Sequence, residues 1–429
     1  MYTIPKGVFD ILPCEPSPDD QWRNSDHWQY VEEIMRMVAH DYGFKEIRTP
    51  LFERTELFLR GVGESSDIVS KEMYTFEDKA KRSMTLRPEG TAAVMRAFIE
   101  KHLDQIPGLH KFFYIEPMFR YERPQAGRFR QHHQFGVEAI GIASPEQDVE
   151  IIDMLCHLYR KLGLKDLNII LNSVGDESCR QPYKQALSEY LTPHFEKLSL
   201  ESQIRFSKNV LRILDSKDEE DQKILEHAPS ILEMLNEACL EHFLRVRHLL
   251  EKMGLPYQIN PKLVRGLDYY NKTVFEITSG FLGAHNTLVG GGRYDGLSAL
   301  LGGPNLPAVG FATGIERLLQ TMTKQGAPFP QPPHPLLFII PLGKNTLDFC
   351  MDLVAQLRHH SIPTEIDLSG KKIQHGLHLA NTLKAEYCAV IGDEELSSQV
   401  ISLKHLSSRQ TENISAKDLI FKLKQGERG

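Results

Sequence analysis

The sequence predicts an α/β protein with an α+β core, in which an antiparallel sheet is flanked by helices and a smaller α/β domain follows. Two long runs of strand-forming residues, 110–122 and 132–142, are joined by a polar, arginine-containing loop, which predicts an antiparallel pair with a long connection. Segment 175–252 has no strand signal and takes helical spacing, so it predicts a helical insertion. From residue 336 onward strand and helix patterns alternate, as is typical of an α/β domain.

Composition excludes several classes of protein. The chain has 429 residues, which allows roughly two to four domains. With 41% hydrophobic residues and a net charge of −7, we expect no disorder, and the acidic balance argues weakly against a protein coated in nucleic acid. Six scattered cysteines without a C-x-x-C pair argue against a zinc knuckle and a disulfide framework, and favour a reducing cytosol. Short apolar runs and an N-terminus without a secretory pattern predict a cytoplasmic protein without a membrane partner.

The N-terminal part predicts an amphipathic helix and then mixed elements. Between residues 22 and 42 apolar residues recur at helical spacing, as at Trp28, Val31 and Met35. The predicted elements that follow are an extended segment at 45–58 that passes through Pro50, a strand at 83–86, and a helix at about 91–101 that Pro88 opens.

The middle and C-terminal parts repeat this mixture around the insertion. After the strand pair, the predicted elements are a helix at 147–162, a strand at 167–174, the insertion, strands at 274–278 and 286–289, and a helix that starts near 315. Prolines mark 328–335 as a linker. The last domain predicts strands at 336–341, 364–368 and 387–391 with helices between them.

The strand pair carries charged residues that need partners. With period two, one strand face holds Glu116, Met118, Arg120 and Glu122, and the returning strand holds Gln134, Gly136 and Glu138. A solvated sheet face is one explanation, because unpaired buried charges are costly. The loop favours a ligand instead, because its arginines suit phosphate oxygens and its aromatic ring suits a base. These loop residues are Arg120, Arg123, Arg128, Phe129 and Arg130.

Three other segments carry chemistry with a plainer alternative. Gly290–Gly296 lacks the endings of both nucleotide-binding glycine motifs, so we favour a turn where two backbones pass closely. Arg317 lies in a first helical turn, where a bound anion would suit it, although an ion pair with Glu316 is simpler. Arg265 next to Gly266 has open space around its guanidinium and no obvious carboxylate partner in the sequence. The paired histidines have no third ligand at useful spacing, so we expect no metal held by the protein.

Taken together, these segments resemble the bacterial-type histidyl-tRNA synthetases, which are class II aminoacyl-tRNA synthetases. Residues 45–58 resemble motif 1, a dimer-interface element; 119–138 resemble motif 2; and 310–317 resemble motif 3. These motifs identify only the class. Specificity for histidine rests on 263–271 and 290–296, which resemble the two histidine signatures, and on 86–91. Thr313 replaces the aliphatic residue usual in motif 3.

The resemblance implies a role for each matching residue. Arg120 and Arg265 would be catalytic and contact the α-phosphate from two sides. Glu122 would contact the adenine amino group, Phe129 would stack on the base, and Arg317 would hold the γ-phosphate. The implied histidine-binding residues are Glu89, Thr91 and Gln134 at the α-amino group, Glu138, Tyr269 and Tyr270 near the imidazole, and Arg265. Arg123 and Gln125 would approach the acceptor end of the tRNA.

The resemblance also implies the reaction and the organisation of the chain. A homodimer would join L-histidine to tRNA(His) in two steps, with ATP as substrate and Mg²⁺ as cofactor. The implied parts are a catalytic core at 1–174 and 253–327, the helical insertion at 175–252, the linker at 328–335 and an anticodon-binding domain at 336–429. Two alternatives stay open: a regulatory subunit of ATP phosphoribosyltransferase, which shares the catalytic fold, and a synthetase for another amino acid.

Overall fold

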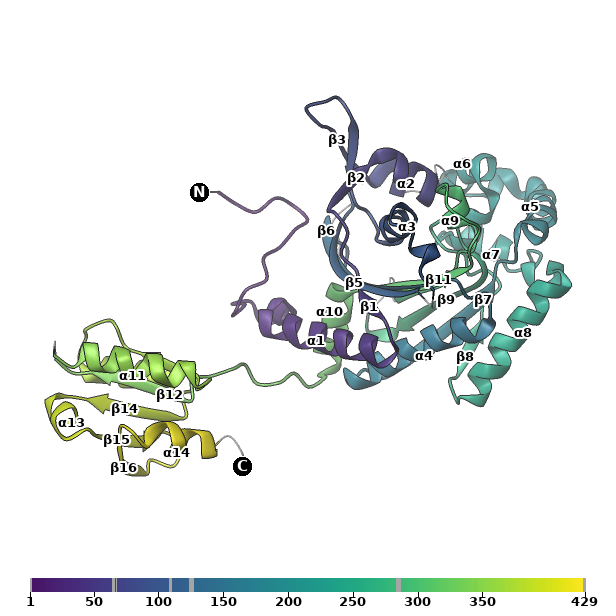
Figure 1. Ribbon diagram of the computed structural model, residues 1–429. Coiled ribbons are helices and arrows are strands. Elements are labelled where there is room, and N and C mark those ends of the chain that lie inside the picture. Colours follow the sequence, from purple (N-terminus) through teal and green to yellow (C-terminus); the bar gives the residue numbers. More distant parts are fainter. Residues whose placement is uncertain are drawn as a thin grey trace. The chain divides into compact units, whose positions relative to one another are not determined.

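The structure is a computed structural model (Figure 1) that describes residues 2–63, 66, 68–107, 110–122, 127–282, 287–343 and 345–426. It divides into two compact units, Met1–Pro330 and Gln331–Gly429. In the described residues, no helix combines the length and the apolar character that a membrane crossing requires.

The first unit is built on an eight-stranded sheet. Its strand order is β1 (Lys45–Glu46), β5 (His110–Phe119), β6 (Gln131–Ile140), β11 (Ala308–Gly314), β10 (Thr287–Arg293), β9 (Asn271–Ser279), β7 (Leu167–Ser173) and β8 (Tyr257–Ile259). The six inner strands pair antiparallel, and the two edge strands pair parallel. The predicted antiparallel pair is therefore confirmed as β5 and β6. Strand β5 ends at Phe119, so Arg120 and Glu122 lie beyond its end and not on its face.

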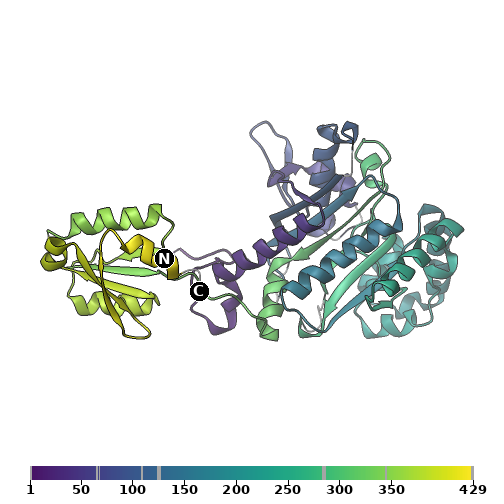
Figure 2. The ribbon, with the colours of Figure 1, turned by 60° about the horizontal axis from the view of Figure 1, so that its bottom comes forward.

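One face of this sheet carries the main hydrophobic core. It is covered by α1 (Ser25–Asp41), α4 (Pro145–Lys161), α8 (Glu237–Lys252) and α10 (Ile315–Gln325). A short helical turn at Pro18–Arg23 precedes α1 and adds Trp22 to this core. Figure 2 shows α1 and α4 side by side across the sheet. Sheet residues such as Phe135, Phe275 and Phe311 are buried against these helices. Because alternate residues point to opposite faces, the neighbouring Gln134, Glu138 and Glu276 face the other side.

The opposite face carries smaller elements, most of them from residues 52–105. They are α2 (Thr55–Val62), α3 (Thr91–Glu100), α9 (Leu297–Leu300), short helical turns at Ile68–Glu72 and Leu103–Gln105, and a three-stranded sheet of β2 (Phe52–Arg54), β4 (Ser83–Leu86) and β3 (Tyr74–Glu77). A further helical turn, Gly280–Leu282, contacts α10. The prediction that 55–58 is extended is wrong, because α2 begins at Thr55. Pro88 also lies outside α3, which Gly90 precedes as the N-cap.

Residues 174–256, all of which the structure describes, contain only helices as regular elements. These are α5 (Glu177–Leu191), α6 (Leu200–Lys208), α7 (Glu219–Leu225), turns at Thr192–Lys197, Val210–Asp215 and Ile231–Met234, and then α8. They enclose a separate core that includes Leu187, Ile213 and Leu225. Only the first turn of α8 belongs to that core, because Phe243 and Val246 pack on the main sheet core.

A buried charge network ties this region to the sheet. Arg293 on β10 and Asp148 on α4 are both fully buried, with Nε of Arg293 3.0 Å from Oδ1 of Asp148. His242 on α8 approaches the same carboxylate at 2.7 Å. Burial opposes ionisation of Asp148, but His242 and Arg293 more than offset it and lower its pKa. Removing one partner of such a network typically costs about 3–5 kcal/mol, so it holds α4, α8 and β10 together.

The second unit is a five-stranded sheet with helices on both faces. Its strand order is β13 (Thr364–Ile366), β12 (Leu337–Pro341), β14 (Tyr387–Ile391), β15 (Val400–His405) and β16 (Thr411–Ser415). The first three are parallel, and the last two are antiparallel. The predicted alternating α/β domain is confirmed. Helices α11 (Leu347–His359) and α14 (Leu419–Gly426) pack on one face, α12 (Ile373–Thr382) packs on the other, and α13 (Asp393–Ser398) leads into β15.

Candidate active site

A cavity over the outer face of the sheet collects most of the predicted site residues. Its lining comes from β5, β6, β10 and β11, from the first turns of α3 and α10, and from segment 265–270. The predicted residues that line it are Glu89, Thr91, Arg120, Glu122, Phe129, Gln134, Arg265, Tyr269, Tyr270 and Arg317. Glu138 lies behind the wall, and Arg123 and Gln125 fall outside the described residues.

Arginines outnumber carboxylates at one end of the cavity and make it positive. Arg317 donates from Nε to the Gly127 carbonyl at 3.0 Å and from a terminal nitrogen to the Thr287 carbonyl at 2.9 Å. Within the described chain, no carboxylate lies at ion-pair distance from Arg317. Burial lowers the pKa of Arg317, and the positive charges of Arg128 and Arg120 lower it further. Such uncompensated buried charge suits an anionic ligand.

The expected ion pair between Arg317 and Glu316 is wrong. The Glu316 carboxylate points back to β6, where it accepts the backbone N–H of His133 at 2.8 Å. It also lies 2.9 Å from Nδ1 of the same residue. Because Glu316 is already satisfied by His133, the Arg317 guanidinium keeps its charge available to the cavity.

Arg265 is held by a carboxylate that the sequence did not indicate as its partner. Its guanidinium forms an ion pair with Glu276 on β9, and Thr287 on β10 donates to the other carboxylate oxygen at 2.9 Å. The guanidinium lies against Gly290, where a Cβ would overlap it. The predicted turn at Gly290–Gly296 is therefore wrong for 290–293, which belong to inner strand β10, and a turn follows only at 295–296. The close approach is confirmed. The pattern of β9 carried one signal, because Glu276 interrupts an apolar strand.

Arg120 and Phe129 stand at the two ends of the loop between β5 and β6. Arg120 donates from Nε to the Pro88 carbonyl at 2.8 Å. Glu122 lies 3.9 Å from a terminal nitrogen of Arg120 and 3.3 Å from one of Arg128. The Phe129 ring packs edge-on against Phe9, with centroids 4.8 Å apart, so packing fixes its plane. Arg120 and Phe129 therefore have fixed positions on the cavity wall.

The other end of the cavity presents carboxyl, amide and hydroxyl groups. Glu89 accepts the backbone N–H groups of Thr91 at 2.8 Å and Ala92 at 2.9 Å, and so caps α3. Oε1 of Gln134 is buried without a hydrogen-bond donor among the described residues. A buried acceptor without a donor costs about 1–3 kcal/mol, so this oxygen suits a ligand that carries an N–H group.

Glu138 is buried behind this end and is surrounded by hydroxyl groups. Thr91 donates to its carboxylate at 2.7 Å, Tyr114 donates at 3.3 Å, and Tyr294 donates to the second oxygen. Burial raises the pKa of Glu138 to about 8, although these hydrogen bonds oppose the shift. Tyr114 and Tyr294 were not predicted to contact Glu138. Period two on β5 could have indicated Tyr114, because it shares the face of Glu116.

Comparison with known proteins gives a consistent result over the full length. The family described as histidyl-tRNA synthetase matches residues 19–318, and an anticodon-binding domain family matches residues 337–426. The histidine–tRNA ligase of Protochlamydia amoebophila is 56% identical over 423 residues, 99% of each chain. That of Bacillus subtilis is 46% identical over 432 residues, which cover 100% of each chain.

Solved structures agree with these sequence matches. The apo histidyl-tRNA synthetase of S. aureus superposes with a TM-score of 0.83 at 38% identity, covering 99% of this chain and 100% of that one. A Bacillus halodurans protein described as an ATP phosphoribosyltransferase regulatory subunit/histidyl-tRNA synthetase shares the fold, with a TM-score of 0.63 at 21% identity, over 91% of this chain and 98% of that one.

Proposed function

The chain belongs to the histidyl-tRNA synthetase family, and we propose how its cavity carries out the family's reaction. The chain ligates L-histidine to tRNA(His): ATP activates histidine to histidyl-adenylate with release of pyrophosphate, and the histidyl group then passes to the 3′ end of the tRNA with release of AMP. One observation carries the assignment of steps to residues. Arginines outnumber carboxylates at one end of the cavity, and a buried carboxyl group with hydroxyl donors lies behind the wall of the other end.

In the first step the histidine carboxylate attacks the α-phosphorus of ATP, and the bond to pyrophosphate breaks. We assign Arg120 and Arg265 to the α-phosphate, where negative charge grows on the oxygens, and Arg317 to the γ-phosphate. The attacking carboxylate is already ionised, so the step needs neither a protein nucleophile nor a general base. Glu276 positions Arg265, because it pairs with that guanidinium from a strand beside the cavity.

The adenine and the amino acid occupy different parts of the cavity in this proposal. Glu122 accepts from the adenine amino group, and the Phe129 ring stacks on the base. Glu89, Thr91 and Gln134 hold the α-amino group, which the unpartnered Gln134 oxygen supports. The imidazole lies toward Glu138, Tyr269 and Tyr270.

The end of the cavity that we assign to the imidazole would make the chain selective for histidine, so a separate editing site is not needed. An apolar side chain there would leave buried carboxyl and hydroxyl groups without partners. Sites of this type discriminate by about 10⁴-fold or more. We therefore expect the chain to reject amino acids that lack two ring nitrogens.

Magnesium enters with ATP in this proposal. Mg²⁺ prefers oxygen ligands, and most of these are usually water molecules and phosphate oxygens of the substrate. The carboxylates beside the cavity arginines, Glu122 and Glu276, already face guanidinium groups, which fits an ion carried by the substrate better than one in a protein cage. When bound, it would neutralise phosphate charge alongside the arginines.

The tRNA contacts both units in the proposed complex. The second unit matches the anticodon-binding domain family, and we assign the anticodon to it. Arg123 and Gln125 remain our proposed contacts to the acceptor end. We keep 1–174 and 253–327 as the catalytic core, 175–252 as an insertion domain, 328–335 as the linker and 336–429 as the anticodon-binding domain.

We also propose a homodimer that works in the cytoplasm, where tRNA is charged for translation. The motif 1-like segment exposes Leu51 and Phe52, which are 48% and 49% exposed. Large apolar side chains grouped at a surface often mark a protein interface. Light scattering of the purified chain would measure the assembly.

Pyrophosphate exchange into ATP, measured with each standard amino acid in turn, tests the function. We expect exchange with histidine alone, followed by histidine transfer to tRNA(His). The regulatory-subunit alternative predicts no exchange, and a synthetase of other specificity predicts exchange with another amino acid. The resemblance implies that a regulatory subunit would lack the C-terminal domain and the Arg265 signature, and this chain has both, which supports the synthetase.

A further inference from the structure

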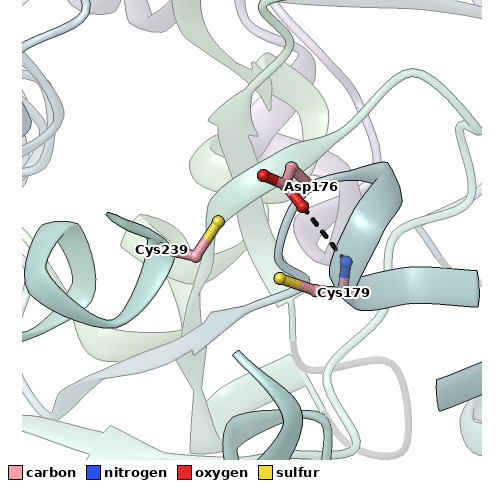
Figure 3. Close-up of side chains that lie close together, drawn as sticks. All are labelled: Asp176, Cys179 and Cys239. Atoms are coloured by element: carbon pink, nitrogen blue, oxygen red, sulfur yellow. Dashed lines mark hydrogen bonds between the residues drawn. The ribbon is translucent and has the colours of Figure 1, made fainter. Parts of the chain in front are cut away.

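A second cluster of ligand-type side chains lies in the helical region, outside the cavity. Asp176, Cys179 and Cys239 place one carboxylate oxygen and two sulfur atoms within 4.8 Å of one another (Figure 3). Both cysteines are only 1% exposed. They are 60 positions apart in the sequence, so their meeting is a product of the fold.

The cluster is built where two helices begin. Asp176 is the N-cap of α5 and accepts the Cys179 backbone N–H at 3.1 Å. Asn236 is the N-cap of α8 and accepts the Cys239 backbone N–H at 2.8 Å. Each cysteine therefore occupies the third position of its helix. The partial positive charge of a helix N-terminus favours a negative charge there. Burial and the nearby Cys179 and Asp176 nevertheless raise the pKa of the Cys239 thiol, so a metal ion must displace its proton.

Asn236 also ties the two helix starts together. Its backbone N–H donates to Sγ of Cys179 at 3.2 Å, and its side-chain amide donates to Asp176 at 2.9 Å. These contacts orient a sulfur and a carboxylate toward the same point. Polar groups that orient ligands in this way are characteristic of metal sites.

We propose that Asp176, Cys179 and Cys239 bind one thiophilic divalent metal ion, with the preferences of Zn²⁺. On binding, the two thiols release their protons to solvent, two metal–sulfur bonds and one metal–oxygen bond form, and the aqua ion loses water. No electrons move. The bound set carries a net charge of about −1, which the two helix N-termini favour. A water molecule completes the tetrahedron that Zn²⁺ prefers.

The ion would hold the first turn of α5, where the helical region begins, in place against the catalytic core. Arg180, the residue after Cys179, donates to the backbone carbonyl of Tyr270 at 2.6 Å. Tyr270 belongs to the proposed histidine-binding segment. A metal that orders the first turn of α5 therefore also orders the support of that segment.

The test measures metal content of the full-length chain, purified under reducing conditions and loaded with Zn²⁺ or Co²⁺ alone. We expect about one equivalent of either metal and a sulfur-to-cobalt charge-transfer band. Cys179→Ser and Cys239→Ser should each lose the band. Cys350→Ser is the matched control, because Cys350 is a buried free cysteine in the second unit, and it should keep the band.

Asp176→Asn is a variant that should still fold, because asparagine caps helices as well as aspartate does. We expect its Co²⁺ affinity to fall at least about tenfold with the helical circular dichroism unchanged. The proposal is overturned if the parent chain takes up neither metal, or if the cysteine variants and Asp176→Asn bind as the parent does. A Cys179–Cys239 disulfide in cells quenched with an alkylating agent would also overturn it. Histidine-dependent exchange is measured alongside, so that loss of the main function is told apart from loss of this site.

Discussion

At the scale of single residues, the charge of Glu138 depends on its surroundings. Burial raises its pKa to about 8, so the carboxyl group of the ligand-free chain is mostly protonated at neutral pH. A free histidine side chain titrates near about 6.5. If the complex holds one proton between the carboxylate and the imidazole, binding between these two values needs no net proton exchange.

The affinity for histidine should therefore pass through a maximum between about pH 6.5 and 8. Below this window a proton must be released on binding, and above it a proton must be taken up, so the affinity falls by up to about tenfold per pH unit on each side. Glu138→Gln should lose the decline that begins near pH 8 and bind more weakly throughout. Isothermal titration calorimetry at several pH values measures both. Parallel pH profiles for the two proteins would contradict the assignment.

Arg265 and Glu276 make a second prediction at this scale. Arg265→Ala should slow single-turnover adenylate formation at least about 10²-fold, the size typical of one lost transition-state donor. Glu276→Gln keeps the guanidinium but weakens its positioning, so we expect a smaller loss that appears in kcat more than in KM. Rapid-quench measurement of adenylate checks both. Glu100→Gln, which breaks a surface ion pair with Arg96, is the control and should leave the rate unchanged.

At the scale of elements, β10 shows why a glycine run need not be a turn. Gly290 leaves room for the Arg265 guanidinium, whereas a Cβ on Gly292 would lie 2.6 Å from the Thr273 carbonyl oxygen of β9. The first neighbour is a flexible side chain, and the second is backbone. The same strand therefore has one glycine that serves the site and one that serves sheet packing.

Alanine at these two positions should separate activity from stability. Gly290→Ala should displace Arg265 and reduce adenylate formation while changing the free energy of unfolding little. Gly292→Ala should lower the free energy of unfolding by about 1–3 kcal/mol, because backbone must move to admit the methyl group. Urea denaturation and pyrophosphate exchange, done on both variants, distinguish the effects. Equal losses of stability would show that Arg265 cannot move aside.

At the scale of the whole molecule, the chain folds as two units with separate hydrophobic cores. The net charge of −7 suggested little affinity for nucleic acid. Several arginines nevertheless line the cavity, so the net charge of the whole chain does not describe the local charge there. Binding through few phosphate contacts depends only modestly on salt, so the acidic body fits selective recognition of tRNA.

Truncation after Pro330 should spare histidine activation and weaken tRNA charging. The cavity lies entirely in the first unit, whereas the second matches the anticodon-binding domain family. Pyrophosphate exchange should stay near the parent rate, and the KM for tRNA(His) should rise. If exchange and charging fall together, the second unit supports the fold of the first and is more than a tRNA-binding part.

Local patterns were enough for several elements and for the family. Runs of strand-forming residues predicted β5 and β6, alternation predicted the α/β second unit, and most of the side chains singled out in the motifs line the cavity. The predictions failed at the start of α2, at the glycine strand β10 and at the partner of Glu316. At β10 and at Glu316, contacts with distant strands overrode the local preference, as tertiary structure commonly does. At α2 the signal was local, because Thr55, Phe58 and Val62 are buried at helical spacing.

The sequence by itself determined the family, the reaction and most of the longer elements, because motifs and periodicity lie within a few neighbouring residues. The pairing of Arg265 with Glu276, the hydroxyl groups around Glu138 and the meeting of Cys179 with Cys239 came only from the tertiary structure. Each joins residues from different elements or from an element and a loop. Spacing along the chain carries no record of such contacts, because sheet order and helix packing alone bring these residues together.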